Sequence, residues 1–149
     1  MTEINSNLRN EVIRAEAITT YNKAFNLHES GKDELAAIEV ANASIHLWRQ
    51  VGNDHNLAIG YWLASRIYAQ FGHSKLAIAT SEKSLHHLDQ IDKPADWLIA
   101  SIHEGWARAL VSADDSRANA AIEKTRELIA NISDAGDREL IESQFSTLV

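Results

Sequence analysis

Apolar residues between positions 56 and 71 recur at helical spacings and cover most of a helix circumference rather than one stripe. These apolar positions are Leu57, Ile59, Tyr61, Trp62, Leu63, Ala64, Ile67, Tyr68 and Phe71. The segment contains one glycine and no proline, which favours an uninterrupted helix. Because its apolar side chains point in several directions, we expect this helix to have neighbours on several sides.

A turn and a second helix follow this segment. Gly72 suits the left-handed conformation that often follows a helix, and Ser74 suits the N-cap position of the next one. Small and apolar residues then recur at spacings of three and four, at Leu76, Ala77, Ser81, Ser84, Leu85 and Leu88. The two helices are therefore predicted to form an antiparallel hairpin.

A similar pair of helices is predicted before this hairpin, over residues 5–29 and 35–51, with Gly31 in the turn and Asp33 as a cap. The expected buried side of its first helix consists of Leu8, Val12, Ala15, Ile18, Ala24, Phe25 and Leu27. Trp48 lies near the end of its second helix, where we expect it to cover the junction with the next hairpin.

A third pair is predicted over residues 95–111 and 118–132, after a polar connection at 89–96 that contains Pro94. In this pair the segment Asp114-Asp115-Ser116 replaces the turn glycine of the other two, so we expect this turn to be the least regular of the three. A shorter seventh helix is predicted over residues 137–148. We interpret it as an end cap, because stacked helical units need a terminal element with one polar face.

The three pairs repeat at a spacing of about 41 residues. Gly72 and Ala77 follow Gly31 and Ala36 by 41 residues each, and Arg66 has its counterpart at Arg108, 42 residues on. Three such units are about the number needed for stacked hairpins to share a continuous core. The repeat therefore predicts an all-α protein in which successive hairpins lie side by side.

The arrangement of Ala64, Tyr68, Gly72, Ala77 and Ser84 resembles the tetratricopeptide pattern of small, aromatic and turn-glycine positions. The resemblance covers roughly residues 15–132, with a period longer than the usual 34 residues, as in variants with lengthened helices. It implies one domain, 1–149, folded as a right-handed α-α superhelix. Its parts would be hairpins at about 5–51, 55–90 and 95–132 and a capping helix at 137–148.

In tetratricopeptide hairpins the first helices line a concave groove, which implies a set of groove residues here. These candidates for binding a ligand or partner are Tyr21, Asn22, Phe25, His28, Trp62, Arg66, Glu104 and Arg108. Arg66 and Arg108 beside aromatic residues favour an anionic or peptide ligand, because guanidinium groups bind carboxylates and stack on rings. The alternative is local: Glu104 and Arg108 form an intrahelical ion pair, and Arg66 stacks on Trp62.

Composition limits the classes of function. The 149 residues suit one domain, and the net charge of −7, without a Lys/Arg cluster, argues against a nucleic acid as partner. The chain has no cysteine, and its first residues lack the basic and apolar plan of a signal peptide. No apolar run reaches the length of a membrane helix. We therefore expect a cytoplasmic protein with no membrane association.

The sequence offers little support for catalysis or for a metal site. The seven histidines lack ligand-like spacings, so no metal or other cofactor is expected. His103 and Glu104 with Arg108 could form an acid–base cluster, but no nucleophile completes it. Catalytic residues are therefore not assigned.

Three hypotheses follow for the function. The first is a non-enzymatic scaffold or adaptor that binds a protein or a peptide through the groove, or binds another copy of itself as a homodimer. The second is a sensor that holds a small anion or a signalling peptide on Arg66 and Arg108. The third is a weak hydrolase or metal site around His103 and Glu104. Trp97, at a helix start, is expected to be partly exposed and to contact a partner.

Overall fold

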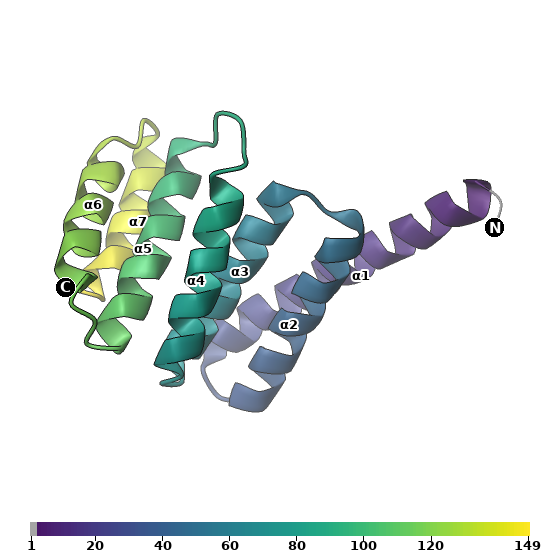
Figure 1. The fold of residues 1–149 in the computed structure, drawn as a ribbon, viewed down its shortest axis with the longest axis horizontal. Coiled ribbons are helices and arrows are strands. Elements are labelled where there is room, and N and C mark those ends of the chain that lie inside the picture. The colour runs from purple at the N-terminus through teal and green to yellow at the C-terminus, as the bar shows by residue number, and fades with distance from the viewer. Residues whose placement is uncertain (1–2) are drawn as a thin grey trace.

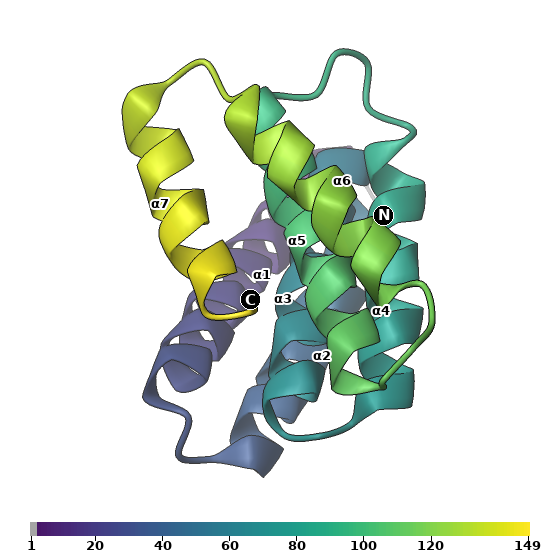
Figure 2. The ribbon, with the colours of Figure 1, turned by 90° about the vertical axis from the view of Figure 1, so that its left-hand side faces the viewer.

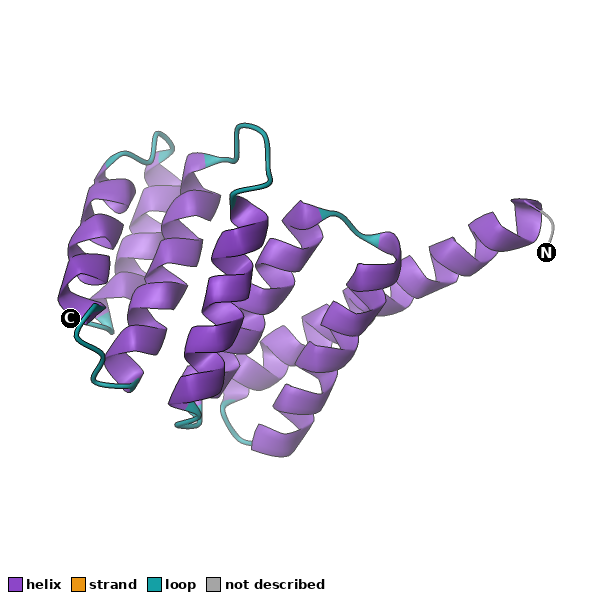
Figure 3. Ribbon diagram, viewed as in Figure 1, coloured by secondary structure: helices purple, strands orange, loops and turns teal. Residues whose placement is uncertain are grey.

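The computed structural model describes residues 3–149, and every regular element in that range is an α-helix (Figure 1 and Figure 3). The seven helices are α1 (Glu3–Ser30), α2 (Glu34–Val51), α3 (Asp54–Gln70), α4 (Ser74–Leu88), α5 (Asp96–Ser112), α6 (Ala118–Ala130) and α7 (Ala135–Ser146). The predicted all-α class is therefore confirmed. None of these helices combines the length and the apolar character needed to span a membrane.

Neighbouring helices in the sequence also lie side by side in space. Figure 1 shows α1 beside α2, α3 beside α4, and α5 beside α6, and these three pairs share the most extensive contacts. Helix α3 contacts α1, α2, α4 and α5, which explains why its apolar residues surround the helix instead of forming one stripe. Helix α7 packs against α5 and α6.

Small residues allow the helices of each pair to approach closely. Ala17 and Ala24 are the buried residues of α1, and Ala24 shares an apolar cluster with Ala37 and Ala41 of α2. Two buried hydroxyl groups link paired helices: Oγ of Ser44 donates to the carbonyl of Ala17 at 2.9 Å, and Oγ of Ser84 donates to the carbonyl of Ala58 at 2.6 Å.

The turns follow the expected chemistry at most positions. Oδ1 of Asp33 accepts a hydrogen bond from the backbone N–H of Ala36 at 3.1 Å and so caps α2. Gly31 and Gly72 have φ angles of 63° and 82°, in the left-handed region that glycine adopts most readily. Asp114 takes the same region with φ 50°, so it occupies the position of the turn glycine.

Three boundary predictions were wrong. Ser74 is the first residue of α4 and not its N-cap, because its hydroxyl donates instead to the carbonyl of Ser112 at 2.8 Å. Helix α6 ends at Ala130 and not at residue 132. In the turn that follows, the Asp96 carboxylate of α5 accepts hydrogen bonds from the backbone N–H and the hydroxyl of Ser133, at 2.9 and 2.8 Å. Helix α7, predicted over residues 137–148, spans Ala135–Ser146.

The prediction for the buried side of α1 was wrong in its first half. Leu8, Val12 and Ile18 are exposed, with 58%, 61% and 47% of their surface accessible. Helix α2 ends at Val51, whose carbonyl accepts a hydrogen bond from the guanidinium of Arg14, so α1 extends past its neighbour toward the N-terminus (Figure 1). The side chains of residues 3–12 are all exposed, because no other helix of the described chain lies beside them.

Candidate functional site

An open cavity lies between α1 and α7 and is formed by residues of α1, α3, α5 and α7. In Figure 2, α4 and α7 lie on opposite sides of α5, and α7 lies on the same side as α1. The cavity has a volume of about 280 Å³, and we call it the apolar groove. Its lining consists of Tyr21, Phe25, Ile59, Trp62, Trp97, Leu98, Ser101, Ile102, Asp137, Leu140, Ile141 and Gln144.

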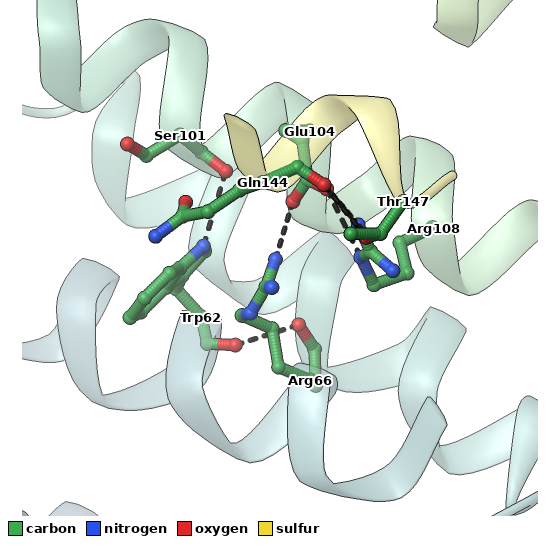
Figure 4. Close-up of polar contacts among 8 residues, drawn as sticks. Trp62, Arg66, Ser101, Glu104, Arg108, Gln144 and Thr147 are labelled. Atoms are coloured by element: carbon green, nitrogen blue, oxygen red, sulfur yellow. Dashed lines mark hydrogen bonds and ion pairs between the residues drawn. The ribbon is translucent and has the colours of Figure 1, made fainter. Parts of the chain in front are cut away.

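Trp62 is held in place at the junction of α3 and α5. Its indole Nε1–H donates to the carbonyl of Ser101 at 3.0 Å (Figure 4). Gly105 provides the space for the ring, because a Cβ atom at that position would lie 2.9 Å from Cδ1 of Trp62. The hydrogen bond and the close approach to Gly105 therefore fix the position of this ring in the groove wall.

Apart from Asp137 of α7, the side chains that line the groove are uncharged, and most of them are apolar. Burial raises the pKa of Tyr21 to about 12, so the phenol stays neutral at physiological pH. Trp97 and Leu140 are also accessible to solvent, with exposed fractions of 37% and 59%, although both line the groove. Exposed large apolar side chains next to a cavity are typical of a contact surface.

A second cavity, of about 420 Å³, lies near the C-terminal ends of α1, α3 and α5, and we call it the arginine pocket. Its lining consists of His28, Arg66, Ala69, Gln70, Arg108, Val111, Ser112, Thr147 and Leu148. The Gln70 amide nitrogen donates to the carbonyl of His28 at 3.0 Å, so its Oε1 accepts from Nδ1–H of the imidazole at 2.8 Å. Burial lowers the pKa of His28, which favours the neutral imidazole.

Glu104 joins the two arginines of this pocket (Figure 4). Its carboxylate is 1% exposed and accepts from Nη1 of Arg66 at 2.5 Å and from Nε and Nη2 of Arg108 at 3.0 and 2.5 Å. Nη2 of Arg108 also donates to the carbonyl of Gln144 and to Oγ1 of Thr147, at 2.9 and 2.8 Å. The cluster therefore connects α3, α5 and the end of α7.

The charge of this cluster is only partly balanced. Burial lowers the pKa of Arg66, and the Glu104 carboxylate acts in the opposite direction. The Arg66 guanidinium also lies over the Trp62 ring, 5.4 Å from its centroid. Within the ion-paired cluster two guanidinium groups share one carboxylate, and Glu29 is a further acidic neighbour of Arg66. The local contacts expected from the sequence therefore coexist with two guanidinium groups that line a pocket.

The structure separates the predicted groove residues into two sets. Tyr21, Phe25 and Trp62 line the apolar groove, whereas Arg66 and Arg108 line the arginine pocket together with His28. Asn22 is exposed and lines neither of these cavities. Glu104 is buried beneath the two arginines, so it positions them and does not itself face a ligand.

Sequence reasoning missed the contribution of α7 to the groove. Leu140 and Gln144 line the groove, and Ile141 both lines it and packs in the core with 3% of its surface exposed. Adjacent residues on a helix point about 100° apart, so Leu140 and Ile141 face different sides of α7. Two adjacent apolar residues of this kind were the signal in the sequence that α7 has a second contact surface besides the one that faces the core.

The third hypothesis has little geometric support. The charged neighbours of His103 are Lys124 and Asp89, whereas Glu104 is enclosed by the two arginines. Burial lowers the pKa of His103, so its imidazole is mainly neutral near pH 7. Residues 3–149 contain no group of three or more His, Asp or Glu side chains that could hold a metal ion.

Comparison of the chain with protein-family models, with curated proteins and with solved structures gave no significant match.

Proposed function

We propose that this protein is a non-enzymatic interaction module that binds a protein or peptide segment in the apolar groove. The observation that carries this proposal is the groove itself, an apolar cavity of about 280 Å³ bordered by the exposed side chains of Trp97 and Leu140. Large aromatic side chains in partly preformed pockets are the usual anchors of protein interfaces. An amphipathic helix is the partner geometry that such a groove between helices fits best.

We further propose that the fold is a tetratricopeptide-like right-handed superhelix with α7 as its last element. Repeated details support this architecture. The positive φ angles at Gly31, Gly72 and Asp114 recur after 41 and 42 residues. The buried hydroxyl of Ser44 bonds α2 to α1 in the same way that the hydroxyl of Ser84 bonds α4 to α3.

A matched pair of leucines provides the test. Leu140 and Leu76 are both exposed helical leucines, with 59% and 49% of their surface accessible, but only Leu140 lines the groove. A photo-crosslinking amino acid is placed at either position in the native cell, and adducts are identified by mass spectrometry. We expect a specific protein adduct from position 140 and none from position 76.

A variant checks that the adduct forms in the groove. Trp97→Ala should weaken binding of the identified partner by about 5- to 30-fold, because loss of an interface tryptophan commonly costs about 1–2 kcal/mol or more. Equal capture from positions 140 and 76, or no capture from either, would contradict the proposal.

The arginine pocket favours a second candidate function, which is sensing of a small anion or an acidic peptide end. Arg66 and Arg108 both line this pocket and share the single buried carboxylate of Glu104, so the ion-paired cluster itself carries one excess positive charge, with Glu29 as a further acidic neighbour. A ligand present at 100 times its dissociation constant would stabilise the fold by about 2.7 kcal/mol. A thermal-shift screen with phosphate and dicarboxylates should then reveal a shift in the wild type that is lost in the Arg66→Gln/Arg108→Gln double variant. Shifts of equal size in both proteins would count against this site.

A further inference from the structure

The first three turns of α1 are a helix without a neighbour. All residues from 3 to 12 are exposed, and we call this segment the overhang. It includes Ile4, Leu8 and Val12, whose exposed fractions are 79%, 58% and 61%. A helix of this length has little stability of its own in water, because most helical stability in proteins comes from packing of an apolar face.

The apolar side chains of the overhang belong to a longer stripe. The stripe consists of Ile4, Leu8, Val12, Ala15, Ile18, Tyr21 and Phe25. From Ile4 to Phe25 it advances 21 residues in six steps, a mean spacing of 3.5 residues. That spacing is the one by which two helices pack along a shared line of contact.

The second half of this stripe forms the wall of the groove. Tyr21 and Phe25 line the apolar groove, and Ile18 and Tyr21 line a smaller adjoining cavity of about 180 Å³ together with Trp48 and Ile59. The same line of side chains is therefore an exposed ridge at one end of α1 and the edge of a concave surface at the other. The ridge and the concave surface are both present in every copy of the chain.

We propose that a second copy of this chain binds here, with the two α1 helices antiparallel and each overhang lying along the apolar groove of the other copy. The inference rests on the proposed function, in that the groove accepts a helix. A two-fold axis near Ala15 aligns the apolar positions, because residues whose numbers sum to about 30 then lie opposite each other. The resulting pairs across the two copies are Ile4 with Phe25, Leu8 with Tyr21, Val12 with Ile18, and Ala15 with itself.

Dimensions are consistent with this arrangement. Ten helical residues extend about 15 Å, enough to cover the stretch from Ile18 to Phe25, which is about 10 Å long. Ala15 at the centre is exposed and small, so two helix backbones can approach closely there. The contact is isologous, so it closes with two copies and uses both overhangs and both grooves.

The size of the contact favours the groove over a simpler alternative. If only the two overhangs touched, each copy would contribute three aliphatic side chains, far fewer than the 20–30 residues per side of a stable interface. Seating each overhang in the groove also covers the exposed apolar side chains of Ile18, Trp97 and Leu140. This arrangement therefore covers most of the large exposed apolar residues that the described part of the chain presents.

Charge along α1 does not oppose the pairing and does not favour a lipid surface. Charged residues alternate in sign along its first half, in the order Glu3, Arg9, Glu11, Arg14 and Glu16. No block of like charge is therefore brought opposite another in the antiparallel pair. A helix that binds anionic lipid usually carries an excess of lysine and arginine on its polar face, which the overhang lacks.

The chain has no cysteine, which allows a direct test of the register. A cysteine introduced as Ala15→Cys lies on the proposed two-fold axis, so mild oxidation should join two copies by a disulfide. The matched control is Lys75→Cys on α4, outside the stripe and the groove, which should remain unlinked. We expect the Ala15→Cys product to appear at micromolar protein and to disappear when Leu8→Asp is added.

Sedimentation of the purified, cysteine-free chain measures the association itself. We expect a reversible monomer–dimer equilibrium whose dissociation constant rises at least about tenfold in Leu8→Asp and stays within about twofold in Leu76→Asp. Both leucines are exposed, so neither change should disturb folding, and circular dichroism verifies this. A chain that stays monomeric up to about 1 mM, or a dimer that is insensitive to Leu8→Asp, would overturn the inference.

The outcomes also separate this inference from the proposed function. If the chain is monomeric but position 140 captures a different protein, the groove binds a partner and the second copy is not that partner. If neither a second copy nor another protein is captured through position 140, both ideas fail. A Leu8→Asp-sensitive dimer with a disulfide at position 15 supports both.

Discussion

Glu104→Ala removes the carboxylate that holds Arg66 of α3 and Arg108 of α5 together. The acid is 1% exposed, and the side chains of the two arginines are 10% and 21% exposed. Without it, two guanidinium groups of like charge remain close to each other in a site that water reaches poorly. Arg108 would keep its hydrogen bonds to Gln144 and Thr147 but lose the partner that orients it toward α7.

The expected cost follows from this burial. Removing one member of a buried ion pair typically destabilises a protein by about 3–5 kcal/mol. Because both arginines retain some contact with water, we expect a value at the lower end, about 3 kcal/mol. For a chain of this size, that corresponds to a fall in melting temperature of about 6–12 °C.

Urea unfolding, followed by circular dichroism and tryptophan fluorescence, measures the free energy of unfolding. A double-mutant cycle with Arg66→Ala isolates the interaction between the two helices, and we expect a coupling energy of about 1–3 kcal/mol. Glu123→Ala is the matched control, because Glu123 is 70% exposed and forms a loose surface ion pair with Arg126 at 3.7 Å. Loss of this pair should cost less than about 0.5 kcal/mol. Equal effects of Glu104→Ala and Glu123→Ala would refute the reasoning.

Three further predictions concern packing, pH and helix capping. Gly105→Ala places a Cβ atom 2.9 Å from Cδ1 of Trp62. Overpacking should cost about 1–3 kcal/mol, which outweighs the gain of about 1 kcal/mol in helix propensity. The variant should therefore unfold at a lower urea concentration, and its tryptophan emission should shift. Unchanged stability and emission would show that the ring adjusts freely. Burial lowers the pKa of His28 and of His103, so between these lowered values and about 6.5 the unfolded chain binds more protons than the folded one. Stability should therefore be complete above pH 6.5 and fall as the pH drops below it, and His28→Gln should reduce this slope in urea unfolding; an identical slope in the variant would contradict the assignment. Asp33→Ala removes the N-cap of α2 and should cost about 1 kcal/mol, measured by thermal unfolding, while Asp33→Asn should cost much less.

The helices and the places where they end were largely determined by local sequence. Apolar spacing identifies α3 because each residue of a helix turns by the same angle, whatever the rest of the chain does. The turns at Gly31 and Gly72 and the cap at Asp33 depend on the conformational preferences of single residues and their immediate neighbours. Such features can be recognised without knowing what packs against them.

Tertiary structure alone decided which apolar side chains are covered and which charges meet. Leu8 and Val12 have the spacing of a buried face, yet they are exposed because α2 ends before it reaches them. Leu140 borders a groove because α7 lies against α5 on the side that faces α1. Glu104 is shared between Arg108 of its own helix and Arg66 of another, and only the intrahelical pair follows from spacing. Contacts between distant segments depend on the relative lengths and positions of whole helices, which periodicity within one helix does not encode.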